Sequence, residues 1–126
     1  MKTLIFHCKN FQSIDVNSEN IPVKVGNSIV IWITFELKDS GRMVDKLIKV
    51  IIETSLDFNE NVITIFPFSH LSNKLLGYEK SIILLEELVK KLEQTSLEIK
   101  IATFGTDKEV LLSIIGHPNN VRFRSF

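Results

Sequence analysis

The sequence is short of the residues on which most disulfide, metal and phosphate sites depend. Its 126 residues include one cysteine, Cys8, so neither an intramolecular disulfide nor a cysteine-based metal site can form. The five glycines are scattered and make no phosphate loop. There is no Gly-x-Ser-x-Gly nucleophile elbow and no His-Glu-x-x-His motif. Any reaction is therefore expected to use activated water and backbone donors, with no metal and no cofactor.

Charge of either sign is not in excess, because 15 basic residues balance 15 acidic ones. This balance argues against a general nucleic-acid-coating surface, while a pocket that grips only the end of an RNA stays compatible with it. No apolar stretch is long enough to cross a membrane, and the first residues turn polar too early for a signal peptide. With a single cysteine, these features predict a cytoplasmic protein without a membrane partner.

The residues that are present predict one globular domain over residues 1–126, with 44% hydrophobic and 24% charged residues. Apolar spacing predicts two amphipathic helices, one starting near Asp39 to Gly41 and one over residues 79–95. Runs rich in β-branched and aromatic residues predict strands. The strongest of these runs, residues 28–35, is expected to be central in its sheet. These strands are residues 2–8, 28–35, 62–66, 97–103 and 109–115, with a hairpin arm within 10–27 and an edge strand in 121–126. The predicted fold class is α/β, a single mixed sheet with two main helices packed on one face.

Two of the predicted strands end in polar, turn-forming segments that are far apart in the sequence. One segment carries Ser69 and His70 after residues 63–68, and the other carries Lys108 between Gly105 and Gly116. Strand ends are where folds present backbone N–H groups and a few side chains to a ligand. The two ends together predict a site with a hydroxyl, an imidazole and an ammonium.

These segments also give the chain a resemblance to a known family. The stretch Phe66 to Ser72 is similar to a Pro-Phe-Ala-His-Leu-Ser loop in the N-terminal editing domain of archaeal-type threonyl-tRNA synthetases. Phe104-Gly105-x-x-Lys108, followed by Ser113-x-x-Gly116-His117-Pro118, is a second, spaced match. The resemblance extends over nearly the whole chain and implies a D-aminoacyl-tRNA deacylase-like fold.

The activity that the resemblance implies is that of an aminoacyl-tRNA deacylase, hydrolysing mischarged seryl-tRNA(Thr) by RNA-assisted attack of water on the ester. Serine lacks one methyl of threonine, and a pocket gains only about 1–3 kcal/mol from such a difference, so a second, editing pocket is needed. The implied catalytic residues are His70, which orients substrate or water, and Lys108, which holds the amino-acid end or water. The implied substrate-binding residues are Val30, Pro67, Phe68, Ser69, Phe104, Gly105 and Asp107.

The sequence departs from the family pattern after the first strand, where Lys9-Asn10 replaces an acidic-aromatic pair, and at three further positions. Thr106 and Asp107 stand where relatives carry aromatic residues before the lysine, and Val121 stands at a position that is glutamate in the family. Asp107 either takes over a polar role or ties up Lys108. Two other functions therefore stay open. One is a catalytically degenerate domain kept for dimerisation or for docking a synthetase or tRNA, and the other is D-aminoacyl-tRNA deacylation.

The partners follow from the same resemblance. They are the 3′ end of tRNA(Thr) carrying serine and a second copy of the chain in a homodimer, with the apolar strand Ile29 to Phe35 expected to supply part of the dimer surface. The domain is expected either to stand alone or to form the N-terminal part of a longer synthetase. In the second case, its partners include catalytic and anticodon-binding domains.

Overall fold

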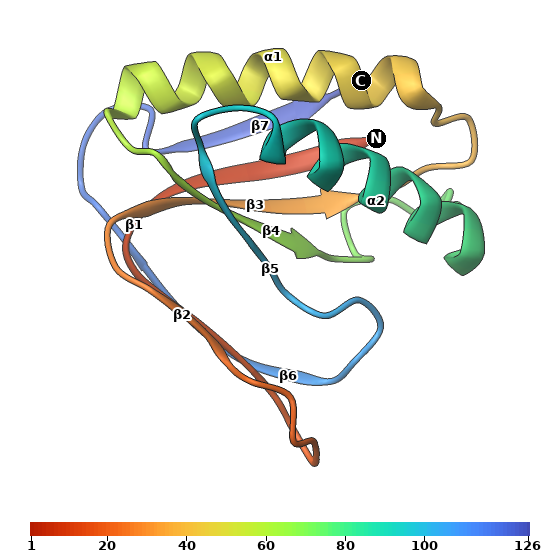
Figure 1. The fold of residues 1–126 in the computed structure, drawn as a ribbon, viewed down its shortest axis with the longest axis horizontal. Helices are drawn as coiled ribbons and strands as arrows, with labels where there is room; N and C mark the ends of the chain where they lie inside the picture. Colours follow the sequence, from red (N-terminus) through yellow and green to blue (C-terminus); the bar gives the residue numbers. More distant parts are fainter.

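The computed structural model describes all of residues 1–126 as one sheet layer covered by one layer of two helices (Figure 1). The helices are α1 (Gly41–Phe58) and α2 (Tyr78–Glu93). The strands are β1 (Lys2–Asp15), β2 (Val23–Val25), β3 (Ser28–Thr34), β4 (Val62–Pro67), β5 (Glu98–Ile101), β6 (Lys108–Ile114) and β7 (Val121–Ser125). Neither helix is both long and apolar enough to cross a membrane.

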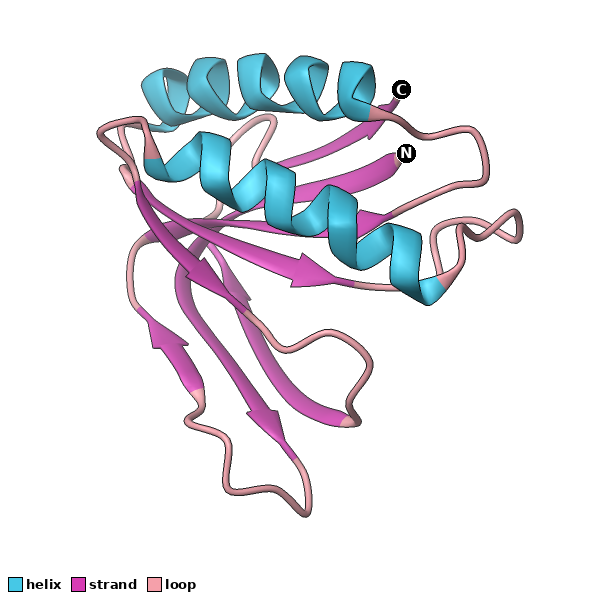
Figure 2. Ribbon diagram, turned by 45° about the vertical axis from the view of Figure 1, so that its right-hand side comes forward, coloured by secondary structure: helices cyan, strands magenta, loops and turns pink.

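Strand β1 organises the sheet because it pairs with four other strands. Its first half lies between β3 and β7, and its second half lies between β2 and β6, all antiparallel. The register on β6 shifts between Cys8 and Asn10, as in a β-bulge, which bends a strand. The end of β1, with β2 and β6, leaves the helical layer as an arm (Figures 1 and 2). On the other side, β3, β4 and β5 pair in parallel, so the sheet is mixed.

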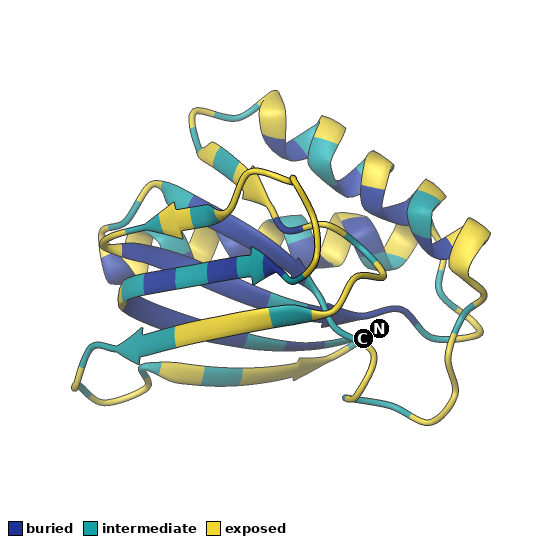
Figure 3. Ribbon diagram, turned by 90° about the horizontal axis from the view of Figure 1, so that it is seen from below, coloured by how far each residue is buried: buried dark blue, intermediate teal, exposed yellow.

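The two helices cover one face of the sheet and bury the main core against it. Apolar residues at helical spacing, such as Leu47 and Ile51 in α1 and Leu88 and Leu92 in α2, are fully buried. Helix α1 is capped at its C-terminal end by Asn59, which adopts a left-handed conformation with φ of 52°. A smaller cluster forms on the opposite face, toward the viewer in Figure 3. Its buried members are Phe6, Cys8, Phe11, Val30, Phe66 and Ala102.

The structure confirms the predicted fold class, and the C-terminal edge strand is present as β7. The two strands on either side of the Gly105 turn pair with different neighbours, since β5 adds to β4 and β6 pairs with β1. Two details differ from the sequence-based expectations. The first strand continues to Asp15 rather than ending at Cys8. The strand Ile29 to Phe35 cannot supply a dimer surface, since it is central and all its residues except Trp32 are buried.

Candidate functional site

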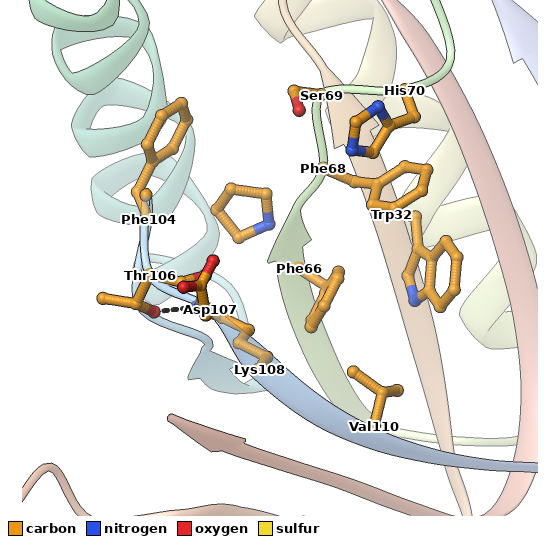
Figure 4. Close-up of a pocket in the computed structure, with 12 residues that line it drawn as sticks. Trp32, Phe66, Phe68, Ser69, His70, Phe104, Thr106, Asp107, Lys108 and Val110 are labelled. Carbon is orange, nitrogen blue, oxygen red and sulfur yellow. Dashed lines mark hydrogen bonds between the residues drawn. The ribbon is translucent and has the colours of Figure 1, made fainter. Parts of the chain in front are cut away.

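A cavity of about 390 Å³ lies where the end of β4 faces the turn that leads into β6. It opens on the side of the sheet that the helices leave uncovered, next to the arm. Figure 4 shows its two walls, one from the β4 end and one from the turn. The residues that line it are Trp32, Phe66, Pro67, Phe68, Ser69, His70, Phe104, Gly105, Thr106, Asp107, Lys108 and Val110.

The β4 wall is largely aromatic. The ring centroids of Trp32 and Phe68 lie 4.7 Å apart, and those of Trp32 and Phe66 lie 5.3 Å apart. His70 meets the edge of this cluster, with its ring centroid 5.1 Å from that of Phe68. The indole Nε1 of Trp32 is buried without a hydrogen-bond partner. Such a wall excludes water from part of the cavity, and it suits a flat or apolar portion of a ligand.

The loop that carries Ser69 and His70 is held by residues of and after β3. The hydroxyl of Thr34, which is buried, donates to the carbonyl of Phe68 and accepts the N–H of Leu71 at 3.3 Å. Farther along the loop, Ser72 donates to the Glu36 carboxylate at 2.6 Å. The backbone that carries the cavity's hydroxyl and imidazole is therefore held from both sides.

The opposite wall begins with a turn that only glycine adopts without strain. Gly105 has φ of 84°, and a Cβ at this position would lie 3.3 Å from the ring of Tyr78. Phe104, just before it, packs edge-to-face on the same tyrosine, with ring centroids 5.1 Å apart. This packing holds the turn in place, since the glycine lets the chain turn while the phenylalanine anchors it.

The ammonium of Lys108 is not free in the cavity, because it forms an ion pair with Asp15 at the end of β1. The two groups are 3.1 Å apart, and the side chains are only 7% and 6% exposed. Thr106 completes the group, since its hydroxyl contacts the lysine and donates to Asp15 at 2.9 Å. Asn20 donates to the other Asp15 oxygen at 2.9 Å. Hydrogen bonds from Asn20, and then from Lys108 and Thr106, hold the pKa of Asp15 well below its usual range, although burial opposes them.

Asp107, in contrast, presents a free carboxylate. Its side chain is exposed and makes no hydrogen bond or ion pair, while its carbonyl accepts the N–H of Val16 at 3.0 Å. Of the two sequence-based alternatives for Asp107, an ion pair with Lys108 is excluded, because Lys108 pairs with Asp15 instead.

The structure brings together eight of the nine residues that the sequence selected: Pro67, Phe68, Ser69, His70, Phe104, Gly105, Asp107 and Lys108. The exception is Val30, which is fully buried in the cluster of the uncovered face and does not line the cavity. Trp32 lines it instead, two residues farther along the same face of β3. Sequence reasoning also missed Asp15, which pairs with Lys108, and Thr34, which hydrogen-bonds to the loop at Phe68 and Leu71. Both contacts join residues far apart in the sequence.

The remaining histidines form a separate cluster near the start of β4. His7 Nδ1 lies 2.7 Å from His117 Nε2, and His7 Nε2 lies 3.1 Å from a carboxylate oxygen of Glu60. The His7 ring also stacks on Phe58 at 4.5 Å. None of these residues lines the cavity. No group of three His, Cys, Asp or Glu side chains is arranged to hold a metal ion.

Comparison with known proteins identifies the family. The model of the archaea-specific editing domain of threonyl-tRNA synthetase matches residues 1–126. The chain therefore belongs to this family of editing domains. Threonine–tRNA ligase of Hyperthermus butylicus is 29% identical over 100% of this chain and 23% of its own length. The threonine–tRNA ligase editing subunit of Saccharolobus solfataricus is 28% identical over 76% of this chain and 25% of its own length.

The curated relatives named above are thus about four times as long as the portion that this chain matches. Solved structures support the fold alone, because their sequence identity is low. The c-Myc DNA Unwinding Element Binding Protein has a TM-score of 0.80 at 14% identity, covering 100% of this chain and 99% of its own. A probable eukaryotic D-amino acid tRNA deacylase has a TM-score of 0.67 at 12% identity, covering 99% and 97%.

Proposed function

We propose that this domain hydrolyses the ester bond of seryl-tRNA(Thr), so that serine attached in error to the threonine tRNA is removed. The observation that carries the proposal is the cavity itself, where the His70 loop and the Lys108 turn form opposite walls. The family match over residues 1–126 supports an editing deacylase for the same fold. The choice of tRNA rests on the names of the longer relatives, which are threonine–tRNA ligases. Serine is proposed because it lacks one methyl of threonine and is therefore hard to exclude by binding alone.

The proposed selection between serine and threonine is steric. A methyl-sized difference gives only about 1–3 kcal/mol when a pocket discriminates by favourable contact. Rigid walls that have no room for the additional methyl discriminate by exclusion instead. The anchoring of the Phe68 carbonyl by Thr34 and of Phe104 by Tyr78 supports such rigidity.

The proposed chemistry uses groups that the walls present and groups that the RNA brings. His70 at the cavity rim orients the substrate or the attacking water, and the ribose 2′-hydroxyl of the terminal nucleotide helps to place that water. Pro67, Phe68 and Ser69 contact the aminoacyl group mainly through their backbone. The ammonium of Lys108 is paired with Asp15, so on the opposite wall it is a fixed hydrogen-bond donor for the substrate or water and adds no net charge.

The deciding experiment measures the deacylation rates of Ser-tRNA(Thr) and Thr-tRNA(Thr) with the wild type, the His70→Ala variant and the His117→Ala variant. We expect fast loss of serine with threonine spared, and a loss of about tenfold to a hundredfold with His70→Ala. The His117→Ala variant should hydrolyse the ester within about threefold of wild type, because His117 lies outside the cavity. No acceleration of either ester by the folded wild type would refute the proposal.

As further parts of this proposal, the domain acts in the cytoplasm as a homodimer, either alone or attached to catalytic and anticodon-binding domains. The surface that we assign to the dimer is the uncovered face of the sheet beside β7. Phe123 and Val121 are 52% and 41% exposed there, opposite Leu4 and Phe6 in the pairing with β1. Exposed apolar residues on a sheet face mark an interaction surface.

A non-catalytic role is the second candidate, and two observations favour it. Lys108 is neutralised by Asp15, and the acid that the family carries at the position of Val121 is absent. In that case the domain would serve dimerisation or docking. A third candidate, hydrolysis of D-aminoacyl-tRNA, is favoured by the fold shared with the D-amino acid tRNA deacylase. Adding a D-aminoacyl-tRNA to the same assay separates all three.

A further inference from the structure

The charge that the cavity offers to a ligand differs from what its lining residues suggest. Asp107 and Lys108 are the lining side chains with formal charges at neutral pH when histidine is neutral, and they would cancel. The Lys108 ammonium, however, is already paired with Asp15 at 3.1 Å, with both side chains buried. Asp15 itself does not line the cavity. The three groups together therefore carry one net negative charge, and it resides on Asp107.

The position of Asp107 suits it for contact with a ligand. Its backbone is anchored, because its carbonyl accepts the N–H of Val16 at 3.0 Å. Its side chain has no partner of its own. Figure 4 shows the Asp107 carboxylate beside Thr106 and Lys108, on the wall across from Phe66. The carboxylate is exposed and lies across the cavity from aromatic side chains, so its charge is available to a cationic group that enters the cavity.

We propose that Asp107 binds the α-ammonium group of the aminoacyl ester. This inference rests on the proposed function, since it assigns one contact of that substrate. An aminoacyl group attached to the end of an RNA has a single cationic centre, the amine, and α-amino groups titrate near a pKa of about 8. The rest of the RNA is anionic. A net negative cavity therefore accepts the amine and repels phosphate, so the aminoacyl end enters while the backbone phosphates stay outside.

The assignment also gives the two walls different tasks. The aromatic wall around Phe68 and His70 faces the ester and the nucleoside, and the Asp107 wall fixes the orientation of the amino acid through its charge. Lys108 and Thr106 then act as positioning residues, because they hold the turn that carries Asp107 against Asp15. An amino acid with a blocked amine would lose this contact and its orientation.

The test uses a substrate analogue that cannot be hydrolysed, 3′-deoxy-3′-(L-serylamino)adenosine, and its N-acetyl form. Binding of both is measured by calorimetry to the wild type, to the Asp107→Asn variant and to a matched control, Glu109→Gln. Glu109 is an exposed acid two residues farther on that does not line the cavity. The wild type and the control should bind the free amine about tenfold tighter than the N-acetyl form. The Asp107→Asn variant should bind the two forms equally.

A preference for the free amine that persists in the Asp107→Asn variant would overturn the inference, as would a wild type that binds both forms equally or neither. Raising the pH from 6 to 9 should also abolish the wild-type preference, because the amine loses its proton. Hydrolysis of Ser-tRNA(Thr) is measured in parallel. Asp107-dependent binding without hydrolysis would support the inference and refute the proposed function. Hydrolysis of Ser-tRNA(Thr) together with binding that does not depend on Asp107 would support the proposed function and refute the inference about Asp107.

Discussion

The ammonium of Lys108 lies 3.1 Å from the carboxylate of Asp15, and the two residues face each other across the pairing of β1 with β6. This ion pair connects the arm of the sheet to the wall of the cavity. The lysine of the recognised motif is thus a fixed part of the structure, and the arm that supplies its partner belongs to the site.

Removing the Asp15 charge should destabilise the domain. In an Asp15→Asn variant the buried lysine ammonium keeps its desolvation cost and loses its counter-charge, so we expect the free energy of unfolding to fall by about 2–4 kcal/mol. Urea denaturation monitored by circular dichroism measures this change. The Asp107→Asn variant is the control, because its carboxylate has no partner, and its midpoint should match the wild type. Equal midpoints for both variants would show that the ion pair does not contribute to stability.

Acid should destabilise the fold through Glu36. Burial opposes its ionisation, but hydrogen bonds from Lys2, the Met1 amino group and Ser72 outweigh this and lower the pKa to about 2. A folded-state pKa below the unfolded value means that the stabilisation is complete above about pH 4.5 and is lost as the pH falls toward about 2.

The expected loss over that interval is about 3 kcal/mol. Denaturation measured at several pH values should show it, and the Glu36→Gln variant should show a shallower decline between pH 4.5 and 2. Parallel curves for the two proteins would contradict the assignment of this titration to Glu36.

Removing the Thr34 hydroxyl should lower both the stability of the domain and its deacylation rate. A Thr34→Val variant leaves the Phe68 carbonyl and the Leu71 N–H without their partner, at a cost of about 1–3 kcal/mol in unfolding free energy. Because these groups flank Ser69 and His70, we also expect the deacylation rate to fall about tenfold or more.

The matched control is Thr54→Val. Thr54 is equally buried, and its hydroxyl donates to the Val50 carbonyl at 2.7 Å in α1, away from the cavity. Both variants should lose similar stability, and only the variant in β3 should lose activity. Equal kinetic effects of the two substitutions would indicate a general loss of folding instead.

The proposed dimer surface should be sensitive to charge. A Phe123→Asp variant places a carboxylate on the uncovered sheet face and should convert the dimer to a monomer, as measured by analytical ultracentrifugation. The control is Leu56→Asp on the outer face of α1, where the side chain is 77% exposed. That substitution should leave the sedimentation coefficient unchanged. A dimer that persists in the Phe123→Asp variant would place the interface elsewhere.

The local elements could be predicted from the sequence because their signals are local. The helical spacing of Leu47 and Ile51, or of Leu88 and Leu92, fixes both the helix and its buried face. Strand pairing could not be read in the same way, since β1 meets β6 and β7 only through long-range contacts. The dimer role expected of Ile29 to Phe35 was wrong for this reason, because the pairing makes β3 central.

The same difference between local signals and long-range contacts decides which parts of the candidate site could be predicted. The motifs identified the residues of both cavity walls, since each motif occupies one continuous turn. Val30 was misplaced because motif position does not say which residues of a strand reach the cavity and which stay under it. Asp15 and Thr34 carry no motif signal, because an acid at the end of a strand and a threonine in a buried strand are common. Only the three-dimensional structure shows that Asp15 pairs with Lys108 and that Thr34 holds the backbone of the loop at Phe68 and Leu71.

The four pairings of β1 also determine when the site can exist. The first strand to be synthesised obtains β6 and β7 as neighbours only after the rest of the domain has been made. Such distant pairings slow folding, because the loop entropy is lost before the contacts form. Until β6 pairs with β1, Lys108 has no counter-ion and the second wall has no support. A nascent chain that ends before β6 lacks Lys108 and Val110, and therefore part of one wall of the cavity.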